Sequence, residues 1–327
     1  MMKVTSSRWI ENTMSHDYLT GGEFMESKIL KYNRKEAFYA IYRTGPFRRI
    51  ALMFSAILIL SIMFGCATGQ SVRLPSVTSS PDGKVYAGKF VWIDLLTEDV
   101  SKAAGFYEGL FSWRAETSKE DKSYYVFSKN GKLIGGMTAV KNKDSKALES
   151  MWLLSLSVND VDRSVAMVKE RGGKLLEGPV DAAGRGRMAL VSDPAGAPFI
   201  LLRATGGDPV DKKAGMGEWL WTDLFTQNAK SAGVFYSALA GYRAERVKVK
   251  KDHQYDVLKR NGRVRAGIVE LQWNGLEDNW LPYFKVADIE PAIQKARQLG
   301  GKLILKTDDV AILTDPTGAA FGIQMVR

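Results

Sequence analysis

The fold is decided by a stretch that occurs twice in this chain. The residues Trp-Ile-Asp-Leu-Leu-Thr stand at positions 92–97, and Trp-Thr-Asp-Leu-Phe-Thr stands at positions 221–226, 129 positions later. Further pairs keep the same order: Phe106-Tyr107 with Phe235-Tyr236, Asn130-Gly131 with Asn261-Gly262, Gly172-Gly173-Lys174 with Gly300-Gly301-Lys302, and Asp193-Pro194 with Asp315-Pro316. The offset drifts only by small loop changes. The chain therefore carries a duplicated domain.

Each copy shows the same succession of strand and helix patterns. Residues 90–96 alternate as a strand, which places Trp92, Asp94 and Leu96 on one face, and residues 100–111 have apolar side chains at helical spacing. Asn130-Gly131 suits a tight hairpin between the two strands that follow. A second cycle repeats the pattern up to about residue 202, with Gly172-Gly173 ending its helix. We expect an α+β fold in which each copy holds two βαβββ units.

The order of these motifs resembles the vicinal oxygen chelate (VOC) superfamily, which contains glyoxalases, bleomycin resistance proteins and extradiol dioxygenases. The resemblance covers residues 86–206 and 215–327, which we predict to be two tandem VOC domains. It implies a cupped, mostly antiparallel sheet in each domain, with a ligand pocket in the concave side. The paired units then pack together within one chain or in a homodimer.

The metal ligands of that superfamily are expected at three positions in each copy. Alignment on the motifs places Trp92, Leu153 and Ile200 there in the first copy. The second copy has Trp221, Leu281 and Gly322 at the same places. These side chains offer none of the imidazole, thiolate or carboxylate groups that transition metals favour. The sequence predicts no metal, no other cofactor, and no glyoxalase or dioxygenase chemistry of the usual kind.

Trp92 with Asp94, and Trp221 with Asp223, form the candidate ligand sites because residues two apart on a strand share a face. An indole beside a carboxylate could stack a planar or cationic ligand, or a desolvated Asp94 or Asp223 could act as a general base. The alternative is that each aspartate is hydrogen-bonded into the wall and each tryptophan is core. Further pocket walls are expected at Tyr125, Trp152, Tyr255 and Trp280.

A Gly-Arg-Gly-Arg segment at residues 184–187 occurs only in the first copy, because the second copy is six residues shorter here. Such a loop can offer backbone amides and guanidinium groups to an anion, or it can be an ordinary exposed hairpin. Its presence in one copy indicates that the two cups are not equivalent.

Charge gives no sign of nucleic-acid binding. The chain has 46 basic and 36 acidic residues. The basic residues after position 65 are scattered, and no basic and aromatic motif accompanies them.

The N-terminal segment indicates export. Arg43, Arg48 and Arg49 precede an apolar run at residues 50–65, which is short for a spanning helix, and the only cysteine, Cys66, follows directly. This arrangement resembles a bacterial lipoprotein signal and predicts lipidation of Cys66; an uncleaved signal anchor is the alternative. Residues 1–65 are then an extension with an export signal, and residues 66–85 a flexible tether. The remainder is expected in the cell envelope, anchored to a membrane and facing the periplasm or the exterior.

Three functions fit these observations. The first is a binding protein for a small hydrophobic or aromatic molecule, and the second is a metal-independent enzyme that uses Asp94 or Asp223 as a base. The third is a structural envelope lipoprotein, which a cup filled by side chains would favour.

Overall fold

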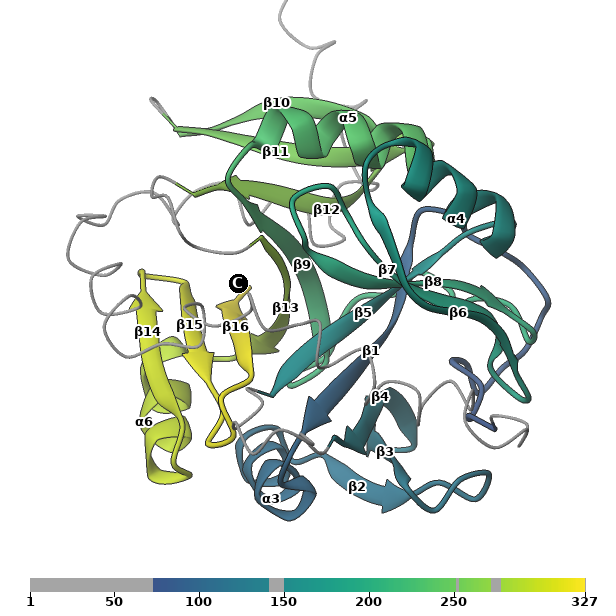
Figure 1. The fold of residues 1–327 in the computed structure, drawn as a ribbon. Coiled ribbons are helices and arrows are strands. Elements are labelled where there is room, and N and C mark those ends of the chain that lie inside the picture. The colour runs from purple at the N-terminus through teal and green to yellow at the C-terminus, as the bar shows by residue number, and fades with distance from the viewer. Residues whose placement is uncertain (1–72, 141–149, 251–252, 272–277, 327) are drawn as a thin grey trace, which may run out of the picture.

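The computed structural model of this chain describes residues 73–140, 150–250, 253–271 and 278–326 (Figure 1). The predicted export signal and Cys66 lie outside the described residues. Within the described residues no helix combines the length and apolar character that crossing a membrane requires.

Two eight-stranded mixed sheets, one from each repeat, make up the molecule. The first repeat contains β1 (Phe90–Thr97), α3 (Val100–Phe111), β2 (Arg114–Thr117), β3 (Tyr124–Lys129), β4 (Lys132–Ala139), β5 (Met151–Ser157), α4 (Val161–Glu170), β6 (Lys174–Ala182), β7 (Gly186–Ser192) and β8 (Pro198–Ala204). The second contains β9 (Trp219–Thr226), α5 (Ala229–Ala240), β10 (Arg243–Lys250), β11 (His253–Arg260), β12 (Arg263–Glu270), β13 (Asn279–Val286), α6 (Ile289–Gln298), β14 (Lys302–Lys306), β15 (Val310–Thr314) and β16 (Ala320–Met325). The expected α+β fold of two tandem VOC domains is confirmed.

Each sheet joins its two βαβββ units in the middle. The first sheet has the order β2-β3-β4-β1-β5-β8-β7-β6, and the second has the corresponding order β10-β11-β12-β9-β13-β16-β15-β14. The central pairs β1–β5 and β9–β13 are antiparallel, whereas β1–β4 and β5–β8 are parallel. Each repeat therefore completes its own sheet from one stretch of chain.

Local sequence explains where the helices and hairpins begin and end. Asp99, Asp160, Asn228 and Asp288 are the N-caps of the four helices, and each side chain accepts a hydrogen bond from a backbone N–H of the first turn. The hairpins at Asn130-Gly131 and Asn261-Gly262 have positive φ at both residues, as the tight turns predicted there require.

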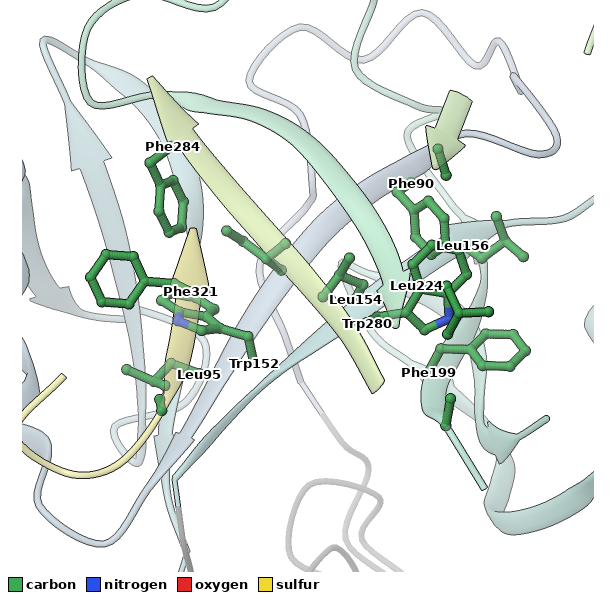
Figure 2. Close-up of a cluster of buried hydrophobic side chains, with 14 of the residues drawn as sticks. Phe90, Leu95, Trp152, Leu154, Leu156, Phe199, Leu224, Trp280, Phe284 and Phe321 are labelled. Carbon is green, nitrogen blue, oxygen red and sulfur yellow. The ribbon is translucent and has the colours of Figure 1, made fainter. Parts of the chain in front are cut away.

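The two sheets pack against each other through the faces that carry the helices (Figure 1). In this core, the ring centroid of Phe90 in the first repeat lies 4.6 Å from that of Trp280 in the second. The ring centroids of Trp152 and Phe284 are 5.8 Å apart. Figure 2 shows these side chains interleaved with Phe199 and Phe321. The opposite face of each sheet carries the residues predicted as ligand sites. We call these faces the first cup, around Trp92, and the second cup, around Trp221.

The segment before the first strand is not a free tether, so that prediction is wrong from residue 73 onward. Leu74 and Val77 are buried among the side chains of the first cup, including Trp92 and Met188. The Leu74 N–H also donates to the carbonyl of Ala183 at 3.0 Å. We call residues 73–79 the strap. Its apolar side chains lower the free energy of the fold by covering the cup.

Candidate functional site

In the first cup, Trp92, Asp94 and Tyr124 form one hydrogen-bonded group. The Trp92 indole N–H donates to Asp94 Oδ1 at 2.9 Å, and the Tyr124 hydroxyl donates to the same oxygen at 2.5 Å. All three side chains are buried. Asp94 is thus hydrogen-bonded into the wall of the cup.

Arg185 completes this group and neutralises the buried carboxylate. Its Nη2 donates to the Tyr124 hydroxyl at 2.8 Å, and its Nη1 lies 3.5 Å from Asp94 Oδ2. The guanidinium also lies over the Trp92 ring, 4.8 Å from the centroid. At 1% exposure Arg185 is neither an exposed hairpin residue nor available to a solvent anion, so neither interpretation of the loop holds for this side chain. Gly184 and Gly186, with φ of 89° and 126°, allow the loop to turn the side chain inward.

The strap closes the first cup over this group. Arg185 Nε donates to the carbonyl of Pro75 at 2.7 Å, while Leu74 and Val77 pack into the same cluster as Leu153 and Ile200. The first cup is therefore filled by the protein's own side chains.

The second cup repeats the group without the arginine. The Trp221 indole N–H donates to Asp223 Oδ1 at 2.8 Å, and the Tyr255 hydroxyl donates to the same oxygen. Burial raises the pKa of Asp223 to about 6, although the hydrogen bonds from Tyr255 and Trp221 oppose the shift. Among the described residues no cation contributes to the pKa of Asp223, so no positive charge opposes the effect of burial.

The second cup also differs from the first in having room for Tyr283. The pairing of β5 with β8 places Ser155 beside Ile200, and the pairing of β13 with β16 places Tyr283 beside Gly322. A Cβ on Gly322 would lie 2.1 Å from the Tyr283 ring. Gly322, which stands where a metal ligand of the superfamily is expected, therefore serves to accommodate a tyrosine.

Three of the residues predicted as pocket walls lie outside the cups. Trp152 and Trp280 face the core between the repeats, where each indole N–H donates to a tyrosine hydroxyl, Tyr107 at 3.0 Å and Tyr236 at 2.9 Å. Tyr125 packs against the same core, since neighbouring residues on a strand face opposite sides. Placing these three in the pocket was wrong; Trp92, Asp94, Trp221, Asp223 and Tyr255 do lie in their cups.

Sequence reasoning missed Tyr124, which is the true partner of Asp94. Tyr124 and Tyr255 are separated by 131 residues, the same offset as Asn130 and Asn261, so the repeat itself would have identified it. Gly136 and Gly267 recur at the same offset of 131 residues, and each lies opposite one of these tyrosines. A Cβ at these positions would lie 1.6 Å and 1.5 Å from the two tyrosine hydroxyls.

Aspartates of the Asp-Pro-x-Gly motifs join the two repeats. The Tyr236 hydroxyl of the second repeat donates to Asp193 Oδ2 of the first at 3.1 Å, and burial raises the pKa of Asp193 to about 6. Burial also raises the pKa of Asp315, which interacts with Tyr107 of the first repeat. These perturbed carboxyl groups have a structural role at the interface.

The three residues predicted to stand at the metal positions, Trp92, Leu153 and Ile200, belong to one buried cluster in the first cup. Their side chains offer one indole N–H, which only donates hydrogen bonds, and two alkyl groups. In the described part of the chain, no group of three or more His, Cys, Asp and Glu residues is placed to hold a metal ion. The residues present do not fit a transition metal.

A pocket of about 460 Å³ opens between the repeats, beside the cups. We call it the junction pocket. Equivalent residues of both repeats line it: Lys89 with Glu218, Phe90 with Trp219, Val91 with Leu220, Trp92 with Trp221, Lys132 with Arg263, Leu133 with Val264, and Ile134 with Arg265. The linker at residues 209–214, strap residues Val77–Ser79, and Thr222, Lys285 and Val326 complete the wall. The pocket is therefore lined largely by equivalent positions of the two repeats.

Basic side chains outnumber acidic ones in the lining of the junction pocket. They are Lys89, Lys132, Lys212, Lys213, Arg263 and Arg265, with Lys285 as a seventh. Asp211 and Glu218 are the two acidic lining residues. Sequence reasoning did not find this site because its residues come from eight separate segments of the chain.

Comparisons with known proteins agree with the fold. Residues 89–201 match the model of the Glyoxalase/Bleomycin resistance protein/Dioxygenase superfamily. Putative glyoxylase CFP32 of Mycobacterium tuberculosis is 29% identical over 241 residues, which are 71% of this chain and 92% of that protein. Anthracycline biosynthesis protein DauV of a Streptomyces species is 29% identical over 259 residues, covering 73% of this chain and 94% of that protein.

Among solved structures, the Mn(II)-bound glyoxalase from Novosphingobium aromaticivorans matches with a TM-score of 0.50 and 14% identity, over 73% of this chain and 82% of that one. This likeness concerns the fold alone. Together with the two repeats and the paired βαβββ units, these matches show that residues 89–201 form a domain of the glyoxalase/bleomycin resistance protein/dioxygenase superfamily, and that the second repeat has the same fold.

Proposed function

We propose that this protein binds a small hydrophobic or aromatic molecule without a metal or other cofactor, and that the junction pocket is the binding site. The observation that carries the proposal is the contrast between the first cup and this pocket. The cup is filled by Leu74, Val77 and Arg185, whereas the pocket has a volume of about 460 Å³ and is lined by Phe90 and three tryptophans. Volumes of a few hundred cubic ångströms with apolar walls are typical of small-molecule sites.

The wall of the pocket suits a planar ring. Trp219 is partly buried, and its indole N–H already donates to the carbonyl of Trp221 at 2.8 Å. What this side chain offers to a ligand is therefore apolar surface and a π face. The names of the relatives that take part in anthracycline biosynthesis are consistent with an aromatic ligand.

Native mass spectrometry of the full chain, purified in a non-ionic detergent without chelator, tests this function. We expect a metal-free protein that carries an organic molecule, or one that takes up a naphthalene probe at a single site. One transition metal ion per chain would overturn the metal-independent function. A protein that neither carries nor takes up such a molecule would overturn the binding function.

Asp223 supports a second candidate, a metal-independent enzyme. A carboxyl group with a pKa of about 6 has the basicity that general-base catalysis near neutral pH requires. Activity on an oxygenated substrate that disappears in Asp223→Asn, with substrate binding retained, would establish this role.

The filled first cup supports the third candidate, a structural envelope protein. This function predicts that no small molecule binds at the junction pocket. The mass spectrometry experiment distinguishes it from the binding function.

We further propose that the protein is exported and held at a membrane of the cell envelope through a lipid on Cys66, with no nucleic-acid partner. The basic flank and short apolar run before Cys66 support this location. Replacing Cys66 by Ser is expected to release the protein from the membrane fraction. A variant that stays fully membrane-bound would instead indicate a spanning helix.

A further inference from the structure

The charge of the junction pocket is not balanced by its own acidic residues. Asp211 already accepts from three cations: Lys89 Nζ lies 3.0 Å from Oδ1, Arg265 Nη1 lies 2.8 Å from the same oxygen, and Arg263 Nη1 pairs with Oδ2. Glu218 pairs with Lys132 at 2.7 Å. With seven basic and two acidic lining residues, the pocket has a large excess of positive charge.

This excess is concentrated at one place in the protein. After residue 65 the chain has 37 basic and 31 acidic residues, a surplus of six. The lining of the junction pocket alone has a surplus of five. A cluster of one sign in a partly enclosed pocket creates a strong local potential for ions of the other sign.

Hydrogen-bond donors remain in the pocket after the ion pairs are formed. Among the described contacts, the guanidinium groups of Arg263 and Arg265 bond only through Nη1, although each carries five N–H donors. Lys213 and Lys285 form no ion pair within the described residues. Burial and the neighbouring Arg265 lower the pKa of Lys89, although Asp211 opposes the shift, so an additional anion would favour its charged form.

We infer that the ligand of the junction pocket is an anionic amphiphile, with a carboxylate or phosphate group held by Arg263, Arg265 and Lys89 and an aromatic or alkyl body against Trp219 and Phe90. Arginine forks match the planar oxygens of a carboxylate or phosphate. The inference rests on the proposed binding function and specifies the class of ligand. Such an anion can come from a free organic acid or from the headgroup of a membrane lipid.

Calorimetric titration of the full chain in non-ionic detergent with 2-naphthoate and with the neutral 2-naphthamide tests this class. The two probes share one ring system and differ in charge. We expect naphthoate to bind about tenfold more tightly, and Arg265→Gln to remove most of this preference while naphthamide binding persists. Persisting naphthamide binding also shows that the variant is folded.

Arg246→Gln is the matched control. Arg246 pairs with Asp256 on β10 and β11, is not part of the pocket lining, and should leave both affinities unchanged. Equal binding of the two probes, unaffected by Arg265→Gln, would overturn the anionic class but keep the binding function. No binding of either probe would overturn both.

Repeating the titration in lipid bilayer discs separates the two sources of the anion. If the ligand is a lipid headgroup, adding phosphatidylglycerol to phosphatidylcholine discs lowers the apparent affinity for naphthoate. If it is a free acid, the affinity is the same in both discs. An affinity for naphthoate no higher than that for naphthamide in phosphatidylcholine discs would contradict the anionic class.

Discussion

At the residue scale, an arginine that occurs only in the first repeat distinguishes the two cups. Asp94 and Asp223 occupy equivalent positions and accept from equivalent indole and phenol groups. Arg185 supplies a cation only to Asp94. The second repeat places the uncharged Tyr283 near its aspartate instead, and burial then raises the pKa of Asp223 to about 6.

Stability should therefore depend on pH through Asp223. The folded pKa of about 6 lies above the unfolded value near 4, so between these values the folded state holds a proton that the unfolded state has lost. The free energy of unfolding should fall as pH rises from 4 through 6, by on the order of 2 kcal/mol from this group.

Asp223→Asn keeps the acceptor oxygen and removes the titration. Urea denaturation between pH 4 and 7 should show equal stability of both proteins at pH 4 and a more stable variant at pH 7. If the free energy of unfolding of the variant changed with pH as it does in the wild type, the raised pKa of buried Asp223 would be contradicted.

The glycines opposite the cup tyrosines give a second prediction at this scale. A Cβ on Gly267 would lie 1.5 Å from the Tyr255 hydroxyl and 2.2 Å from Asp223 Oδ1, so Gly267→Ala forces the hydrogen-bonded group apart. We expect a loss of about 1–3 kcal/mol in thermal or chemical denaturation.

Gly105→Ala is the control, because this glycine is exposed on α3 and a Cβ there meets no atom within 4 Å. It should stabilise the helix by up to about 1 kcal/mol. A Gly267→Ala protein as stable as the control would show that the tyrosine is not fixed beside Asp223.

At the scale of elements, the strap is the feature that sequence patterns did not predict. Its residues are rich in Ser and Pro, which is typical of linkers, and only the packing of Leu74 and Val77 shows that it is part of the first domain. Leu74→Ala should cost about 2–5 kcal/mol of stability.

Val210→Ala offers a matched comparison for the strap, since Val210 is 53% exposed and its truncation should change stability by less than about 0.5 kcal/mol. Chemical denaturation of both variants measures the difference. A Leu74→Ala protein with wild-type stability would mean that the strap does not hold the cup closed.

Elements that are determined by neighbouring residues in the sequence could be predicted, whereas features that depend on distant contacts could not. Apolar periodicity predicted the helix at residues 100–111 correctly, and the Asn-Gly dipeptides predicted two hairpins. The sequence analysis placed Tyr125 in the cup, although Tyr124 is the residue that lies there. A one-residue error in the position of a strand assigns each side chain to the opposite face of the sheet. The inward turn of Arg185 depends on contacts with Pro75 and Tyr124, and local sequence contains neither.

At the scale of the whole molecule, duplication creates both the interface and the junction pocket. Phe-Tyr motifs and tryptophans that recur in the repeats build a core in which each tyrosine interacts with an aspartate of the other repeat. Where β1 and β9 begin, the same symmetry gathers basic residues from both copies around one pocket. Analysis of each repeat by itself could not predict the junction pocket, because residues of both repeats line it.

The central claim is that ligand binds at the junction of the repeats and not in a cup. The most direct test is a crystal structure of the chain with 6-bromo-2-naphthoate, in which anomalous scattering locates the bromine atom. We predict one bromine site between the start of β1 and the start of β9, beside Trp219, with the carboxylate on Arg265. A bromine site inside the second cup, beside Tyr255 and Asp223, would contradict the account.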